Sequence, residues 1–142
     1  MLSPNARGTY EAMRIRLDEL KDRHADPNLQ IVNVLSPGMY DGTANPFDNK
    51  RVGHIPDSIN LPIERFLASE EIPRLKSTDE LQAVLAQAGL SQDTETIVHC
   101  HAGVRTTMGI FVMSLLGWDR VRAYEASMAE WANRDDTPLT TG

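Results

Sequence analysis

The segment "TIVHCHAGVRTTMGIFVMSLLG", residues 96–117, decides the predicted fold. It begins as a short apolar run with β-branched residues, which is typical of a strand buried in a parallel sheet. It continues as a helix that ends at Gly117. Between the two lies a short loop that begins with Cys100, the only cysteine of the chain.

The segments around this one alternate in the same way. Three further apolar runs are typical of strands: residues 30–35, 58–62 and 120–125. Three segments with helical patterns alternate with them: residues 8–23, 77–90 and 127–134. Residues 36–53 read as a long surface loop with one helical turn near Met39 and Tyr40. Strands that alternate with helices predict an α/β domain with a mostly parallel sheet.

The length of 142 residues predicts one domain over residues 1–142. Residues 1–28 are expected to form a helical extension that packs on this domain, and residues 136–142 are expected to fray. Ser77 and Glu80 fit a capping box, and Gly89 fits the position just past the end of that helix.

The composition excludes several partners. The net charge is −6 and no basic block occurs, so neither nucleic acid nor an acidic membrane surface is an expected partner. No apolar run approaches the length of a membrane span. A single cysteine cannot form an internal disulfide, and the first residues lack the apolar stretch of a signal peptide, so we expect a cytoplasmic protein.

Cys100 is expected at the carboxyl end of a strand, the edge of an open α/β sheet where ligands bind. Ala102 and Gly103 are small enough for successive backbone N–H groups to turn toward the sulfur. Together with the helix dipole, these groups favour the thiolate and can lower its pKa from roughly 8.5 to about 7 or below. Arg105 suits an oxyanion or a bracing carboxylate, and His101 is a second, pH-dependent cation.

Less reactive interpretations exist for each of these residues. A lone cysteine is often simply buried. Metal binding by the sequence "HCH" is disfavoured, because neighbouring residues of a strand point to opposite faces. Of the other histidines, His99 is expected under the sheet edge, His24 in solvent at a helix end, and His54 in a structural turn.

Three motifs give the chain a family resemblance. "RVGHIPDSINLP", residues 51–62, resembles the "GHIPGAINLP" segment of rhodanese domains, and "VHCHAGVRTT" resembles their active-site loop, C-x-x-G-x-R followed by Ser or Thr. "YEASMAEW", residues 124–131, resembles the "YDGSWSEW" segment of thiosulfate and mercaptopyruvate sulfurtransferases. The resemblance covers roughly residues 29–135. It implies a rhodanese-like fold, an open, mostly parallel sheet flanked by helices on both faces.

The resemblance also implies a reaction. Cys100 would attack the outer sulfur of a donor such as thiosulfate and hold it as a persulfide until a thiol or cyanide removes it. The backbone N–H groups of residues 101–105 would cradle that sulfur. The resemblance gives the rest of the loop as substrate-binding: His101, Ala102, Gly103, Val104, Arg105 and Thr106. No metal and no cofactor is implied.

The chain departs from the family at three places. The first strand carries Asn33, Val34 and Leu35 where Asp-x-Arg is usual, so Arg105 is expected to lack its usual carboxylate partner. Ala102 replaces the lysine of thiosulfate-specific enzymes, which leaves the donor open. Tandem members pair two domains; in a single domain, either the site is more exposed or the chain forms a homodimer.

Two other functions compete with sulfur transfer from small donors. Dual-specificity phosphatases have the similar signature H-C-x-A-G-x-x-R-S, but it places five residues between Cys and Arg. Here there are four, and the narrower loop suits one sulfur atom better than a phosphate. The second alternative is a persulfide carrier or regulatory module that takes sulfur from one protein and passes it to another without turnover of small molecules.

Overall fold

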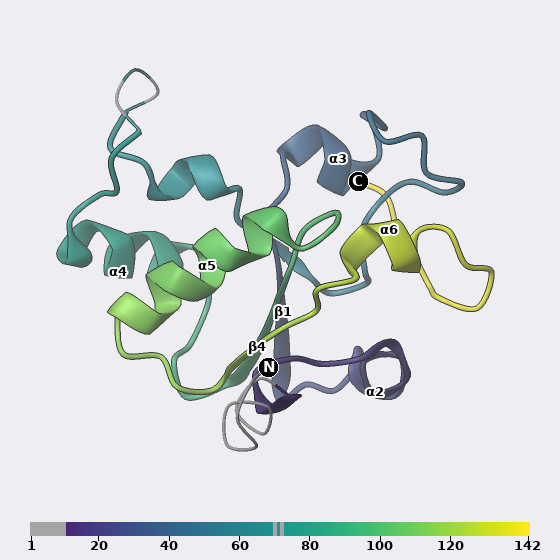
Figure 1. Cartoon of the computed structure of the whole chain (residues 1–142), viewed down its shortest axis with the longest axis horizontal. Coiled ribbons are helices and arrows are strands. Elements are labelled where there is room, and N and C mark those ends of the chain that lie inside the picture. The colour runs from purple at the N-terminus through teal and green to yellow at the C-terminus, as the bar shows by residue number, and fades with distance from the viewer. Residues whose placement is uncertain (1–10, 70, 72) are drawn as a thin grey trace, which may run out of the picture.

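A parallel sheet lies at the centre of the computed structural model, which describes residues 11–69, 71 and 73–142 (Figure 1). The four strands found in these ranges run in the order β2-β1-β3-β4, and every pair is parallel. Their bounds are Leu29–Asn33 (β1), Ile59–Asn60 (β2), Glu95–His99 (β3) and Val121–Ala123 (β4). The structure thus confirms the predicted α/β class.

The two central strands carry the most apolar runs. Val32 of β1 pairs with Val98 of β3, and both side chains are fully buried. The last pair of this ladder joins Asn33 to His99, so both strands end at the same level. Cys100 is the first residue beyond that level, at the carboxyl edge of the sheet, as expected.

Helices cover both faces of the sheet. In Figure 1, α4 and α5 lie on one side and α2 and α6 on the other. The helical elements of the described residues are Leu17–Arg23 (α2), Pro37–Asp41 (α3), the 3₁₀ turn Ile63–Phe66 (η1), Thr78–Gln87 (α4), Val104–Leu115 (α5) and Ser127–Trp131 (α6).

Helix α4 is capped as its sequence predicts. The Ser77 side chain accepts a hydrogen bond from the amide of Glu80, whose carboxylate accepts one from the amide of Ser77. Gly89 follows the last turn with φ of +84°, a left-handed conformation that favours glycine. The helical turn expected near Met39 is also confirmed, as α3.

The helix predicted over residues 8–23 is interrupted. Residues 8–10 lie outside the described ranges, residues 11 and 12 are helical, and α2 begins at Leu17. Before it, Arg14 forms a parallel bridge with Ala123, and Ile15 donates a backbone hydrogen bond to the same residue at 2.9 Å. The chain therefore adds an extended segment to the β4 edge of the sheet, and this pairing separates α2 from the helical residues 11 and 12.

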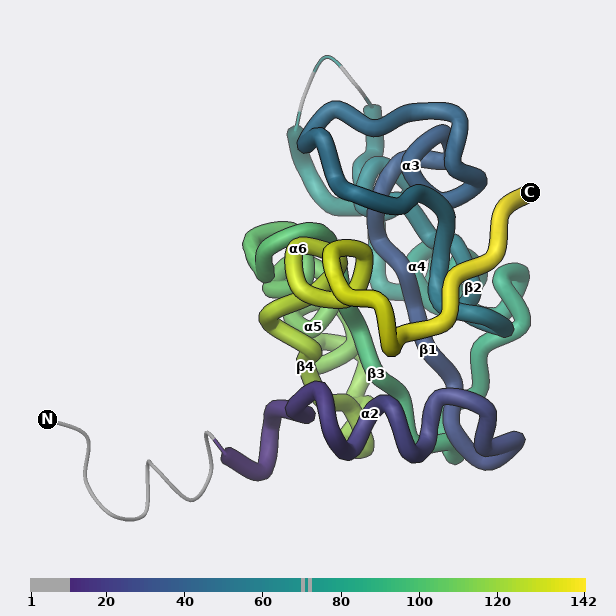
Figure 2. The backbone as a smooth tube through the Cα atoms, turned by 90° about the vertical axis from the view of Figure 1, so that its right-hand side faces the viewer, coloured from purple at the N-terminus to yellow at the C-terminus, as the bar shows by residue number. Residues whose placement is uncertain are grey.

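The prediction that residues 136–142 fray is wrong. Thr140 forms an antiparallel bridge with His54, and the Thr137 side chain is buried. The guanidinium of Arg51 donates hydrogen bonds to the carbonyl and the hydroxyl of Thr137 at 2.6 and 2.7 Å. In Figure 2 the C-terminal segment runs from α6 toward the chain that leads into β2.

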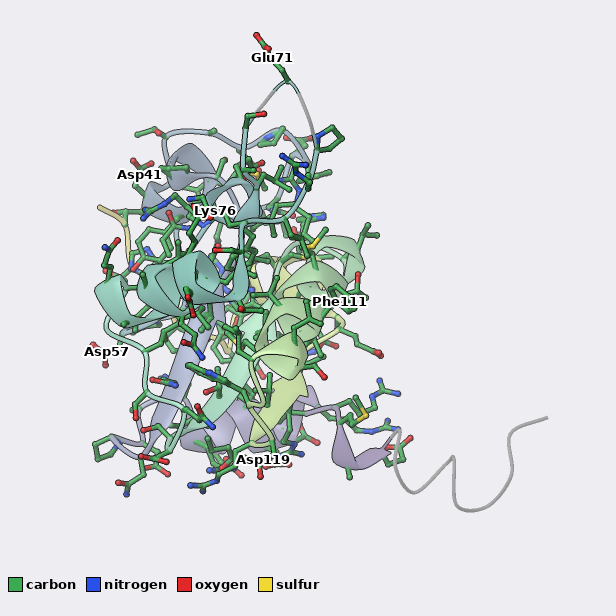
Figure 3. All side chains as sticks on the ribbon, turned by 90° about the vertical axis from the view of Figure 1, so that its left-hand side faces the viewer. Asp41, Asp57, Glu71, Lys76, Phe111 and Asp119 are labelled. Carbon is green, nitrogen blue, oxygen red and sulfur yellow. The ribbon has the colours of Figure 1, made fainter. Side chains whose placement is uncertain are left out.

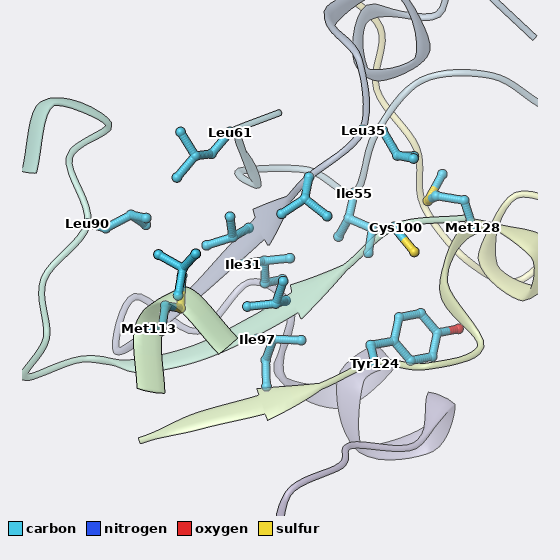
Figure 4. Packing of buried hydrophobic residues seen from close by; sticks show 14 of the residues in the cluster. Ile31, Leu35, Ile55, Leu61, Leu90, Ile97, Cys100, Met113, Tyr124 and Met128 are labelled. Atoms are coloured by element: carbon cyan, nitrogen blue, oxygen red, sulfur yellow. The ribbon is translucent and has the colours of Figure 1, made fainter. Parts of the chain in front are cut away.

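Buried apolar side chains fill the space between the sheet and the helices, and Cys100 lies at the edge of this cluster (Figure 4). On the outer side of α5, Val104, Phe111 and Leu115 are exposed, and Figure 3 shows Phe111 on that surface. In the part of the chain that the structure describes, no helix combines the length and apolar character needed to cross a membrane.

Candidate active site

Cys100 lies just beyond β3, where its sulfur points out of the sheet toward the loop that follows (Figure 4). The residue is only 2% exposed. An inert core thiol and a protected nucleophile would both be buried, so exposure does not distinguish the two interpretations. The groups around the sulfur distinguish them.

Those groups are hydrogen-bond donors. The amide of Gly103 donates to the Cys100 Sγ at 3.1 Å, and the amides of Ala102 and Thr106 are also directed at it. The buried Thr106 hydroxyl has no oxygen or nitrogen partner among the described residues, which leaves its proton free to turn to the sulfur. The sulfur therefore sits in a nest of donors that fits an anion.

The pKa of the Cys100 thiol reflects two opposed effects. Burial raises it, while the hydrogen bonds from the Thr106 hydroxyl and from the amides of Thr106, Gly103 and Ala102 lower it. The donors prevail, and the net pKa lies below that of a free thiol. A buried thiol with a lowered pKa has the electrostatic environment of a reactive cysteine.

Gly103 makes this nest possible. Its φ is +96°, and a Cβ at this position would come within 3.0 Å of the Glu125 carbonyl oxygen. Glycine is the residue that takes this conformation without strain. As the N-cap of α5, Gly103 turns the chain so that the first amides of the helix face the sulfur.

Arg105 does have a carboxylate partner, contrary to expectation. Its guanidinium donates to the Glu64 carboxylate at 3.0 Å, and both side chains are about half exposed. Glu64 belongs to η1, between β2 and α4, so the partner comes from a different part of the chain than the family pattern suggests. Val104, the neighbour of Arg105, is 79% exposed and turns its side chain to solvent.

The ring of His101 is held by two residues of the long loop before β2. Phe47 stacks on it with 3.8 Å between the ring centroids and 12° between the planes. Its Nε2 lies 3.2 Å from the Asn49 Oδ1. Burial lowers the pKa of His101, which works against the predicted role as a second cation.

Helix α6 fixes the backbone at Cys100 from the other side. The amide of Cys100 donates to the Ser127 hydroxyl at 3.0 Å, and that hydroxyl donates to the Tyr124 carbonyl at 2.7 Å. The amides of Met128 and Ala129 donate to the carbonyls of Cys100 and His101. Ser127 is fully buried and has φ of +54°, which is uncommon for a residue other than glycine.

The sequence reasoning missed several of these partners. Ser127 lies within the quoted "YEASMAEW" segment, so the motif itself was the available signal. For Glu64, Phe47 and Asn49, no pattern in the sequence indicated that they approach the loop.

The remaining histidines are structural. His99 is fully buried, as predicted, and its Nδ1 lies 3.1 Å from the Cys100 carbonyl. His54 stacks on Tyr40 and binds its carbonyl, which agrees with the predicted structural role. His24 ends α2 but packs edge-on against Trp131 and is half-buried, not fully solvated as predicted. Over the described ranges, no cluster of three His, Cys, Asp or Glu could hold a metal ion.

Comparison with known proteins identifies the family. The model of the rhodanese-like domain matches residues 16–134. The chain belongs to this family, and the structure has the fold that the resemblance implied.

Among curated relatives, a protein of Haloferax volcanii named "Putative thiosulfate sulfurtransferase" is 31% identical over 97% of this chain and 49% of its own length. The 3-mercaptopyruvate sulfurtransferase of Escherichia coli is 30% identical over 95% of this chain and 47% of its own. The chain thus spans about half the length of the curated relatives it matches. Among solved structures, the anaerobic ergothioneine biosynthesis enzyme of Chlorobium limicola superposes with a TM-score of 0.82 at 23% identity, over 92% of this chain and 32% of that one.

Proposed function

We propose that this chain is a sulfurtransferase that carries sulfur as a persulfide on Cys100. The Cys100 thiolate attacks the outer sulfur of a donor such as thiosulfate, whose S–S bond breaks as sulfite leaves with the bonding electrons. A thiol or cyanide then takes the outer sulfur, and Cys100 returns as the thiolate. The family and the names of the relatives support transfer of sulfur, and the donor and acceptor are part of the proposal.

The observation that carries this proposal is the set of donors around the Cys100 sulfur. They stabilise a thiolate before the reaction and the same negative charge when the sulfur leaves the persulfide again. A cysteine that only packed in the core would stay a neutral thiol, which accepts hydrogen bonds weakly. Donors directed at its sulfur would then stabilise nothing.

The rest of the loop divides the work. Ala102, Gly103 and Thr106 supply the donors to the sulfur. Arg105 remains the proposed binder of an anionic donor, because its guanidinium is half exposed and its present partner, Glu64, is equally open to solvent. Val104 contributes its position at the start of α5, and its exposed side chain has no direct role in the transfer.

The finer features of this function are proposals as well. Cys100 is nearly covered, which favours compact donors such as thiosulfate over bulky ones. The transfer steps need neither a metal nor a cofactor. Exposed Val104, Phe111 and Leu115 along α5 support the expected homodimer, and a cytoplasmic location stays a prediction.

Intact-protein mass spectrometry after thiosulfate treatment tests the proposal. We expect one added sulfur atom, removed by cyanide or by a reductant, and no addition to Cys100→Ser. The serine hydroxyl occupies nearly the same volume but is poorly ionised, so the fold should persist while the transfer is lost. Circular dichroism of the variant provides the control for folding.

Three outcomes would count against the proposal. Sulfur addition to Cys100→Ser would show a different nucleophile. Failure of thiosulfate, mercaptopyruvate and glutathione persulfide alike to load the parent protein would refute an enzyme that uses small donors. Loading solely from a protein persulfide would instead support the carrier alternative.

A further inference from the structure

The ring of His101 has one nitrogen whose partner can be traced through a chain of hydrogen bonds. His101 Nε2 lies 3.2 Å from Asn49 Oδ1, and Asn133 Nδ2 lies 2.9 Å from the same oxygen. The orientation of a side-chain amide has to be deduced from its partners, because oxygen and nitrogen have the same shape. Asn133 has partners that allow this deduction.

Two backbone groups fix the orientation of Asn133. The amide of Lys50, a donor, lies 2.8 Å from one end of the Asn133 side chain, so that end must be the oxygen. The carbonyl of Ala129, an acceptor, lies 2.9 Å from the other end, so that end must be the NH₂ group. Neither contact could survive a flip of the amide.

The same logic extends to the histidine. Because Asn133 directs an N–H at Asn49, the Asn49 atom that receives it must be the oxygen. His101 Nε2 faces that oxygen and must therefore carry a proton. In the neutral ring Nδ1 is then the unprotonated nitrogen, and none of the described residues forms a hydrogen bond with it.

We propose that His101 Nδ1 is the base that accepts the proton of an acceptor thiol when sulfur leaves Cys100. This inference rests on the proposed sulfurtransferase function and adds a catalytic residue to it. Nδ1 is the ring nitrogen nearer the backbone, and His101 directly follows the nucleophile. The stack on Phe47 and the bond to Asn49 hold the ring in one orientation.

The step balances without a further reactant. The acceptor R–SH gives its proton to Nδ1, and the resulting thiolate attacks the outer sulfur of the Cys100 persulfide. The S–S bond breaks, and its electron pair returns to the Cys100 Sγ as the thiolate in the nest of donors. The proton passes from Nδ1 to the outer sulfur, which leaves as R–S–SH. The acceptor sulfur is oxidised to the persulfide level as Cys100 is reduced.

The environment of His101 suits this role better than that of a cation. Free thiols have pKa values of about 8.5 and are mostly protonated at neutral pH, so an acceptor needs a base. Burial lowers the pKa of His101 and keeps the ring neutral in this range. A protonated imidazole could not accept the proton.

The tautomer can be measured without any enzyme assay. In protein labelled with ¹⁵N-histidine, two-dimensional ¹H–¹⁵N spectra of the rings should give His101 the pattern of a neutral ring protonated at Nε2. His99 serves as an internal reference with the opposite pattern, because its Nδ1 faces a carbonyl oxygen and must be the donor. Asn49→Ala should convert His101 to a mixture of tautomers and leave His99 unchanged. An Nδ1-protonated His101 in the parent protein would overturn the proposal.

Kinetics test the chemistry. The persulfide is formed first with thiosulfate, and its discharge is then followed with two thiols of similar size, 2-mercaptoethanol and the more acidic 2,2,2-trifluoroethanethiol. His101→Gln should slow discharge to 2-mercaptoethanol by about 10²–10⁴-fold, the usual contribution of general base catalysis. Discharge to trifluoroethanethiol, largely ionised at mildly alkaline pH, should slow far less, and His24→Gln should change neither rate.

Each alternative outcome has a definite meaning. Equal slowing with both thiols would show that His101 merely supports the loop, and unchanged rates would show that it takes no part; either overturns the inference and leaves the function intact. If no persulfide forms at all, the proposed function falls together with the base. The histidine spectra would still show whether the ring carries its proton where the hydrogen bonds place it.

Discussion

His99 and His101 flank the same cysteine but lie in opposite surroundings. His99 ends β3 in the fully buried interior, while His101 lies in the loop and is half exposed. The hydrogen bonds assign the proton of His99 to Nδ1 and that of His101 to Nε2. Two positions along the chain separate a histidine that packs in the interior from the one that we propose as a base.

The difference shows that burial and partners, not residue type, decide what a histidine does here. Burial lowers the pKa of His99 to about 4, and the Nε2 of this ring has no hydrogen-bond partner among the described residues. The loop after Cys100, in contrast, supplies the hydrogen-bond donors to the sulfur and contains partly exposed side chains such as that of His101.

The largest expected effect is on the free energy of unfolding and concerns His99, at the end of β3. Below pH 6.5 the unfolded chain protonates His99 while the folded chain does not until about pH 4, so the free energy of unfolding should decrease as the pH falls. The stabilisation is complete above pH 6.5, and about 3 kcal/mol should be lost between pH 6.5 and 4. Urea unfolding at a series of pH values measures this slope.

His99→Gln should flatten that slope, because the amide does not titrate. His101→Gln should flatten it less, since His101 is only partly buried. Equal slopes in the parent and His99→Gln would contradict the contrast drawn between the two histidines.

The next effect is on the reactivity of Cys100 and concerns Thr106, in the segment after the loop. Thr106→Val keeps the shape of the side chain but removes a donor to the thiolate, so the pKa of Cys100 should rise and less thiolate should be present at neutral pH. A hydrogen bond to a charged group contributes about 1.5–3 kcal/mol, so alkylation by iodoacetamide at neutral pH should slow at least about tenfold.

Thr107→Val is the matched control. The hydroxyl of Thr107 donates to the Val104 carbonyl at 2.6 Å and is exposed, and it is not among the donors to the sulfur. Its removal should leave the alkylation rate unchanged. If both valine variants behave alike, the Thr106 hydroxyl is not a donor to Cys100.

The smallest effect is a difference in the free energy of unfolding between two variants of Ser127. The hydroxyl of this residue accepts the hydrogen bond of the Cys100 amide. Ser127→Ala leaves the buried amide of Cys100 without an acceptor, at a cost of about 1–3 kcal/mol. Ser127→Gly loses the same bond but relieves the left-handed backbone, so it should be about 1 kcal/mol more stable than Ser127→Ala. Thermal or urea unfolding of the two variants measures this difference, and an alanine variant as stable as the glycine variant would contradict it.

Local patterns predicted most of the fold. The apolar run at residues 96–99, the capping box at Ser77 and the glycine at 103 act within a few residues, so the sequence alone identifies them. The amides of Ala102 and Gly103 were expected at the sulfur for the same reason, because they lie within three residues of it, whereas the two donors from Thr106 were not predicted.

The unpredicted parts depend on contacts between distant segments. Glu64 reaches Arg105 across 41 positions, and Asn49 reaches His101 across 52. The fraying predicted for residues 136–142 was wrong for a similar reason, because polar tails are held by partners that the local sequence does not contain. Such pairings follow from the folded geometry, which no short window of sequence encodes.

The bonds between the C-terminal segment and Arg51 have a practical consequence for handling this protein. Arg51 lies two residues after Asn49, and the backbone of Lys50 fixes Asn133. Trimming the chain before Thr137, or displacing it with a fused tag, would loosen the same stretch of loop that orients the Asn49 oxygen. We therefore expect removal of Thr137 and the residues after it to alter which nitrogen of the His101 ring carries the proton.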